Sequence, residues 1–138
     1  MTEAVLDASV VLKWFGAEAE PNDEQALTLR ARLLAGTLSL VSPSLLRLEL
    51  LNVAGRRWGY GETQLLNLAA AIDDLGFEFR EPGLVGVAVW TGRGLTAYDA
   101  SHVALAEKAS LPLITDDRRI LGVAGDVAFA LARAAELP

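Results

Sequence analysis

One stretch near the N-terminus decides the fold: Ala4-Val5-Leu6-Asp7-Ala8-Ser9-Val10-Val11-Leu12-Lys13-Trp14-Phe15. Its first three residues predict a short buried strand, and the residues from Ala8 to about Phe15 predict a helix. Asp7 lies between the two elements. A carboxylate with apolar neighbours is costly to bury unless it is paired or binds a metal ion. Asp7 is therefore the first candidate functional residue, and the alternative is that it only caps the helix after it.

Short apolar strands and helices alternate along the rest of the chain. Helix-start signals stand at Asn22, at Ser42-Pro43 and at Thr96. The pattern predicts strands over 38–41, 77–80 and 113–115, and helices over 23–35, 43–58, 62–75, 84–93 and 97–109. After Arg119 the pattern weakens, and residues 127–129 could form a last strand or begin a helix through Ala135. This order predicts an α/β fold in which residues 1–138 form a single domain, with a mainly parallel central sheet flanked by helices.

The composition fits one domain with an apolar surplus. The chain has 138 residues, of which 52% are hydrophobic, and its mean hydropathy is +0.33. This fraction is high, because typical domains are about 45–50% apolar even with glycine counted. We therefore expect part of the apolar surface to lie in an interface with another subunit or a partner. No apolar run reaches the ~18 residues of a membrane span, so no membrane association is expected.

The formal net charge of −6 and the lack of cysteine restrict the partners and the metal ligands that this chain can have. A protein that binds nucleic acid through bulk electrostatics is usually basic. An acidic chain can still bind nucleic acid through local arginines or once metal ions neutralise its acids, and it can bind a basic protein segment. With 0 cysteines there is neither a disulfide framework nor a thiolate metal site. The start Met1-Thr2-Glu3 lacks the features of a signal peptide, so a cytoplasmic protein is expected.

Three further acids stand in unusual surroundings. Glu49 lies inside a leucine-rich helix, Asp99 lies in the first turn of an alanine-rich helix, and Asp117 follows the last clear strand. In parallel sheets, functional sites lie beyond the carboxyl ends of the strands. Asp7 and Asp117 both occupy such positions. We therefore expect the fold to bring the four acids together.

Each of these acids also has a structural alternative. Asp99 could be a partner of the helix dipole, and Asp117 could be an ordinary turn residue. Glu49 could form an ion pair with Arg56 or Lys13. The functional interpretation depends on all four acids coinciding at one place.

A cluster of four carboxylates favours a hard divalent cation. Mg²⁺ and Mn²⁺ prefer oxygen ligands, and Mg²⁺ typically binds through one or two carboxylates together with waters and phosphate oxygens. Such ions would activate a water and stabilise the attacking and leaving oxygens of phosphodiester hydrolysis. Without a metal ion the carboxylates would repel one another, so the pKa of at least one should be raised. We therefore predict that metal binding stabilises the fold.

Four segments together resemble the PIN-domain family, and most closely the VapC-type toxins of toxin–antitoxin pairs. They appear in the family's order and span nearly the whole chain: Leu6-Asp7-Ala8-Ser9-Val10-Val11-Leu12-Lys13-Trp14-Phe15, Leu48-Glu49-Leu50-Leu51-Asn52-Val53, Leu95-Thr96-Ala97-Tyr98-Asp99-Ala100 with Ala104-Leu105-Ala106, and Leu113-Ile114-Thr115-Asp116-Asp117-Arg118-Arg119-Ile120. No single segment is specific. Only their combination is specific to the family. It joins the Asp-Ala-Ser-Val start, the Tyr-Asp-Ala helix and the Thr-x-Asp-Arg-Arg end.

The resemblance implies a Mg²⁺- or Mn²⁺-dependent endoribonuclease that hydrolyses RNA phosphodiesters with a metal-activated water. The metal-binding and catalytic acids would be Asp7, Glu49, Asp99 and Asp117. The auxiliary polar residues beside them would be Ser9, Asn52, Thr115 and Asp116. The implied partners are an RNA substrate, a cognate VapB-type antitoxin whose C-terminal segment blocks the site, and a second copy of the chain in a homodimer.

Basic residues and the single histidine could add to the site. The candidate RNA-binding residues are Arg56, Arg118 and Arg119, because a guanidinium can bind a phosphate bidentately, and Arg57 beside Arg56 could do the same. The alternative for each is a solvated position on the surface. His102 lies one turn after Asp99 and could orient its carboxylate or touch substrate, and the alternative is a packed helix residue.

Two other functions fit parts of the sequence. A PIN-like module could bind RNA or protein without cutting it, but intact acids at all four positions argue against this. A phospho-acceptor receiver domain also gathers acids at strand ends. Neither Lys13 nor Lys108 follows a late strand, which argues against a receiver domain.

Overall fold

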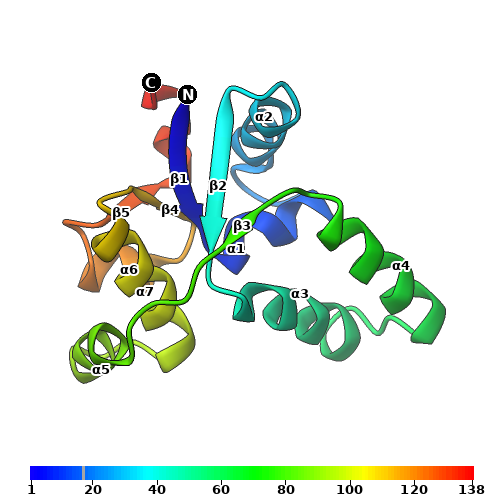
Figure 1. The fold of residues 1–138 in the computed structure, drawn as a ribbon. Coiled ribbons are helices and arrows are strands. Elements are labelled where there is room, and N and C mark those ends of the chain that lie inside the picture. Colours follow the sequence, from blue (N-terminus) through cyan, green and yellow to red (C-terminus); the bar gives the residue numbers. More distant parts are fainter. Residues whose placement is uncertain (17) are drawn as a thin grey trace.

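The computed structural model describes residues 1–16 and 18–138, and strands and helices alternate along them (Figure 1). The strands are β1 (Thr2–Leu6), β2 (Leu38–Ser42), β3 (Glu78–Phe79), β4 (Leu113–Thr115) and β5 (Ala128–Ala130). The α-helices are α1 (Ala8–Val11), α2 (Asp23–Leu34), α3 (Leu45–Arg56), α4 (Glu62–Asp73), α5 (Leu84–Gly92), α6 (Ala97–Ala109) and α7 (Arg118–Val123). Short 3-10 helices are η1 (Leu12–Trp14) and η2 (Leu131–Glu136).

The central sheet confirms the predicted fold class. Its strand order is β3-β2-β1-β4-β5, and within the described residues every strand pair is parallel. β1 occupies the middle, with Ala4 opposite Leu40 of β2 and Leu6 opposite Ile114 of β4. Because the strands run in the same direction, their carboxyl ends lie along one edge, toward which the arrowheads of β1 and β2 point in Figure 1.

Helices cover both faces of the sheet. Ala4 and Leu6 of β1 pack into a cluster with buried residues of α1, α2, α3 and α4. Val5, between them, packs on the opposite face with residues of α5, α6 and α7. Successive side chains of a strand point to opposite faces, and here both faces are apolar. This double burial explains why the strands appear in the sequence as continuous apolar runs.

Of the three predicted helix starts, the one at Ser42-Pro43 is displaced, and the one at Asn22 keeps its position without a side-chain cap. Ser42 is the last residue of β2, because it pairs with Phe79 of β3, and α3 begins only after Ser44. Asn22 precedes α2 in a left-handed conformation with a φ of 66°, and its side chain donates to Asp116 instead of capping the helix. Thr96 is a side-chain cap as predicted, because its Oγ1 accepts a hydrogen bond from the backbone N–H of Asp99.

The C-terminal part resolves the alternatives left open by the sequence. The second alternative, a helix beginning at residue 127, is wrong, since Ala128 to Ala130 form the edge strand β5 and pair with β4. A 3-10 helix, η2, follows the strand. The short helix α7, directly after Asp117, was not predicted. In the described part of the chain, no helix is long and apolar enough to cross a membrane.

Candidate metal centre

A pocket of about 440 Å³ lies at the carboxyl edge of the sheet. Its acidic lining residues, among those described, are Asp7, Glu18, Glu20, Asp23, Glu49, Asp99, Asp116 and Asp117. Lys13 and Arg57 are the basic side chains in its wall. Acids from β1, α3, α6 and the end of β4 therefore face one space, as the strand-end positions of Asp7 and Asp117 led us to expect.

Asp7 ends β1 and is held by two hydroxyl groups. Its residue is only 4% exposed, and its carboxylate accepts hydrogen bonds from Ser9 Oγ (2.7 Å) and Thr115 Oγ1 (2.8 Å). Asp7 stands at the N-cap position of α1, as the structural alternative had it, but its side chain makes no capping bond to that helix. The pKa of Asp7 is raised from 3.8 to about 6, because burial and the charge of Asp117 outweigh the lowering effects of His102 and the two hydrogen bonds. Ser9 and Thr115 thus contact the acid that they were predicted to support.

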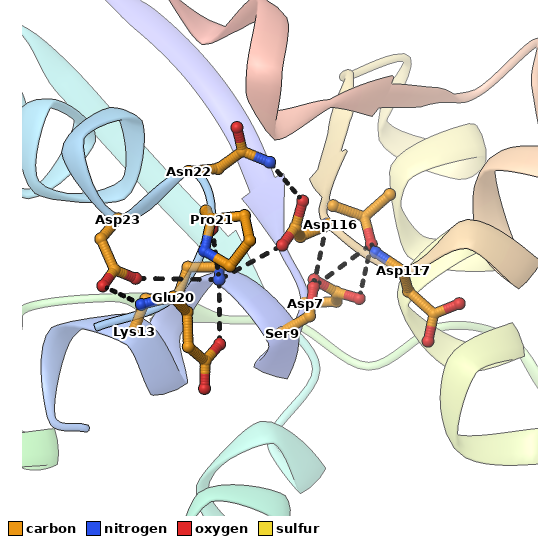
Figure 2. Close-up of polar contacts among 10 residues, drawn as sticks. Asp7, Ser9, Lys13, Glu20, Pro21, Asn22, Asp23, Asp116 and Asp117 are labelled. Atoms are coloured by element: carbon orange, nitrogen blue, oxygen red, sulfur yellow. Dashed lines mark hydrogen bonds and ion pairs between the residues drawn. The ribbon is translucent and has the colours of Figure 1, made fainter. Parts of the chain in front are cut away.

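The end of β4 supplies two adjacent acids with different partners (Figure 2). Asp117 caps α7, because its Oδ1 accepts from the backbone N–H groups of Arg119 (2.8 Å) and Ile120 (3.1 Å). Asp116 turns toward the loop before α2, where it accepts from Asn22 and pairs with Lys13. The proposed auxiliary acid is therefore paired with a lysine, whereas Asp117 has a local structural role, and the described residues donate no hydrogen bond to its second oxygen.

Glu49 and His102 form a direct contact between α3 and α6. His102 Nε2 lies 2.7 Å from Glu49 Oε1, and the imidazole is fully buried. The alternative ion pairs of Glu49 with Arg56 or Lys13 are wrong, since in the described residues Lys13 pairs with other acids and Arg56 with none. His102 is thus a packed helix residue whose polar contact is with Glu49.

Asp99 is half-buried in the first turn of α6. Burial raises the pKa of Asp99, and the negative charges of Asp117 and Glu49 raise it further. The expectation that at least one acid of the cluster has a raised pKa is confirmed. Burial, however, is a larger cause than the repulsion from which the expectation was drawn.

Some predicted residues lie outside the acidic pocket. Asn52 is exposed on α3 and lines a neighbouring cavity together with Glu49 and Tyr98. Arg56, Arg118 and Arg119 are exposed and are not among its lining residues. Among the described residues, the arginine in the pocket wall is Arg57, which directly follows α3. The sequence offered both Arg56 and Arg57 as phosphate ligands, and helical spacing from Glu49 favoured Arg56, the last residue of α3.

The loop before α2 contributes acids that the sequence did not indicate. Glu20 and Asp23 line the pocket and lie near Lys13. In the sequence they are ordinary polar residues of a loop and of a first helical turn. No local signal distinguishes them, because their position depends on how the loop folds back onto β4.

The donor set suits Mg²⁺ or Mn²⁺, since both ions prefer carboxylate oxygens. Yet across residues 1–16 and 18–138, no three His, Asp or Glu side chains stand close enough together to hold one ion. The reason is local, because Asp7, Glu49 and Asp117 are each held by their own hydrogen-bond partners. Binding an ion at this pocket therefore requires side-chain rotations among acids that already face the same space.

A model of the PIN domain family matches residues 4–126, and the chain belongs to this family. PIN domains are generally nucleases. The match covers the four acids Asp7, Glu49, Asp99 and Asp117 and stops before β5. Among curated proteins, none matches the sequence.

Two solved structures resemble the chain along nearly its whole length. PAE2754 from Pyrobaculum aerophilum is 25% identical, with 98% of each chain covered and a TM-score of 0.66. FitAcB from Neisseria gonorrhoeae is 18% identical, with 94% of this chain and 98% of that chain covered and a TM-score of 0.60. The second likeness concerns the fold alone.

Proposed function

We propose that this PIN domain is a Mg²⁺- or Mn²⁺-dependent endoribonuclease and a VapC-type toxin. The observation that carries the proposal is the pocket that Asp7, Glu49, Asp99 and Asp117 line together at the carboxyl edge of a parallel sheet. Two of these acids have raised pKa values, mainly through burial. The ionised form of a buried acid is unfavourable without a partner, so these acids favour a cation beside them.

The four acids would hold the ion, and they differ in how firmly the fold fixes them. Asp7 is fixed by Ser9 and Thr115, and Asp117 is fixed as the cap of α7. Asp99 has fewer constraints, since its hydrogen-bonding neighbour is Thr96, from the same turn of α6, which holds its pKa down against burial. A bound Mg²⁺ or Mn²⁺ supplies Lewis-acid activation of a water and neutralises charge on a phosphodiester.

The surroundings of the acids determine how RNA would enter. The pocket wall is strongly acidic, so an RNA phosphate is repelled from it unless a cation is bound. Arg57 is the arginine in this wall and is placed to bind a phosphate next to the acids. We therefore assign RNA contact to Arg57 ahead of Arg56, Arg118 and Arg119.

Cleavage of structured RNA tests the function. The full chain is incubated with RNA and Mn²⁺, with RNA and EDTA, and as Asp7→Asn with Mn²⁺. The exposed helix-end variant Asp74→Asn is the matched control. Cutting that needs Mn²⁺, is lost in Asp7→Asn and persists in Asp74→Asn supports the nuclease. RNA binding without cutting by any protein would instead support the non-catalytic module.

A cognate antitoxin of VapB type is part of the proposal. The net charge of −6 and the acidic pocket suit a basic inhibitory segment, in particular one that inserts an arginine among the carboxylates. An arginine-containing peptide from a candidate antitoxin should compete with Mn²⁺ for the pocket. Inhibition that is independent of Mn²⁺ concentration would argue against this mode of binding.

A homodimer is also part of the proposal. Leu84, Val85 and Val89 of α5 are exposed, and they form an apolar face that is unfavourable in water. Sedimentation of the purified chain should give the mass of a dimer, and Val85→Asp should reduce it toward that of a monomer. A wild-type chain that sediments as a monomer at high concentration contradicts the assignment.

A further inference from the structure

Lys13 is enclosed by oxygen atoms at the wall of the acidic pocket (Figure 2). Its side chain is only 4% exposed. The ammonium nitrogen lies 3.1 Å from Glu20 Oε2, 3.2 Å from Asp116 Oδ2 and 3.8 Å from Asp23 Oδ1. It also donates to the backbone carbonyl of Pro21 at 2.9 Å. Three carboxylates and a carbonyl from two distant segments thus surround one positive charge.

The surroundings keep this lysine charged. Burial by itself lowers the pKa of Lys13, but Glu20 and Asp116 outweigh burial and raise the pKa above its ordinary value. An ammonium group has three N–H donors, and here Glu20, Asp116 and the Pro21 carbonyl can accept them. The lysine therefore behaves as a permanently bound cation.

The acids of the pocket fall into two groups by their partners. Both oxygens of Asp116 are engaged, Oδ1 by Asn22 (3.0 Å) and Oδ2 by Lys13. In the described residues, Asp7, Asp99 and Asp117 make no ion pair with a lysine or arginine. The three acids around Lys13 share one positive charge, whereas in the described residues no lysine or arginine supplies one to Asp7, Asp99 or Asp117.

We propose that the Lys13 ammonium takes the place of a second divalent cation, so that the pocket binds a single Mg²⁺ or Mn²⁺ ion on the side of Asp7, Asp99 and Asp117. The inference rests on the proposed metal-binding function and determines its stoichiometry. Asp116 then forms an ion pair with Lys13 and does not bind the metal ion.

Removal of this positive charge leaves Glu20, Asp23 and Asp116 facing one another without a cation. Like charges at this separation destabilise the ionised state, and a divalent cation relieves the repulsion. Lys13→Met keeps the length of the side chain but has no charge, whereas Lys13→Arg keeps the charge. The first variant should open a second cation site and the second variant should not.

The experiment counts Mn²⁺ ions bound per chain, by the electron paramagnetic resonance signal of free Mn²⁺ during titration of the full protein. We expect one ion for the wild type and for Lys13→Arg, and two for Lys13→Met. The double variant Lys13→Met/Asp116→Asn should return to one ion, because a ligand of the second site is lost. Lys108→Met, at an exposed lysine of α6, is the matched control and should bind one.

Several outcomes would overturn the inference. Two Mn²⁺ ions bound to the wild type would mean that Lys13 does not exclude a second ion. One ion bound to a folded Lys13→Met would mean that the lysine only holds the loop before α2 in place. If Lys13→Met does not fold, as judged by its melting curve, Lys13→Gln and the wild-type count replace it. No Mn²⁺ on any protein overturns the metal centre and the inference together. The expected counts without RNA cleavage overturn only the nuclease and support the inference.

Discussion

His102 of α6 donates a hydrogen bond from Nε2 to Oε1 of Glu49 on α3, 53 residues away in the sequence, across 2.7 Å. A carboxylate can only accept, so the Nε2 of the imidazole carries the proton. The other ring nitrogen, Nδ1, is buried and has no hydrogen-bond partner among the described residues. The contact fixes one oxygen of Glu49 and joins the two helices that carry Glu49 and Asp99.

The first prediction concerns this contact. His102→Leu should lower the affinity for Mn²⁺ by roughly 10–100-fold, the usual effect of losing a residue that orients a metal ligand. His102→Gln, whose amide can still donate, should lose less. Calorimetric titration measures both, with Ser101→Ala as a control for a change at a neighbouring buried position. Equal affinity in His102→Leu and the wild type would show that the contact serves packing alone.

The second prediction is that metal binding raises the melting temperature. A ligand at about 100 times its Kd stabilises the folded state by about 2.7 kcal/mol. For a chain of this size that corresponds to a rise of roughly 5–10 °C. Scanning calorimetry with millimolar Mg²⁺ or Mn²⁺ measures the rise, which should be absent in Asp7→Asn/Asp99→Asn. An unchanged wild-type melting temperature contradicts the metal centre.

The third prediction is a pH dependence of stability that comes from Asp7. The pKa of Asp7 is raised from 3.8 to about 6 in the folded protein, mainly by burial. The folded state therefore binds its proton more tightly than the unfolded state does. The stabilisation is present below about pH 4 and is lost as the pH rises to about 6, and its size is about 3 kcal/mol.

Urea unfolding in EDTA at pH 4 to 7 measures this dependence. The difference between the wild type and Asp7→Asn isolates Asp7, because the other titrating groups are common to both proteins. The free energy of unfolding of the wild type should fall relative to that of Asp7→Asn as the pH rises through this range. Asp74→Asn should follow the wild type, and parallel curves for Asp7→Asn and the wild type would falsify the prediction.

The fourth prediction separates two adjacent arginines. Arg57 lines the acidic pocket and Arg56 does not. Arg57→Ala should weaken RNA binding in Mn²⁺ by a few-fold and reduce the slope of log affinity against log salt by about 0.7, the value for one phosphate contact on a single strand. Arg56→Ala should leave both nearly unchanged. Fluorescence anisotropy with a labelled RNA measures both effects, and the reverse order of the two variants would contradict the assignment.

The sequence by itself determined the fold class and the strand-end positions of two candidate acids, Asp7 and Asp117. Strand and helix periods are local properties, so the elements around β1, β2, β4 and α6 could be predicted from residue spacing alone. Asp7 and Asp117 follow predicted strands, and the geometry of a parallel sheet brings such positions to one edge. A raised pKa was predicted from the repulsion between clustered carboxylates, whereas burial is its larger cause in the structure.

Only the tertiary structure decided which groups touch. β5 is a strand because β4 offers it an unpaired edge, and nothing within residues 127–129 requires that. His102 reaches Glu49, and Lys13 reaches Asp116, because the helices and the loop before α2 fold onto the sheet at particular angles. Hydrogen bonds and ion pairs act over about 3 Å, whereas the periodicity of a sequence fixes only the face on which a side chain lies.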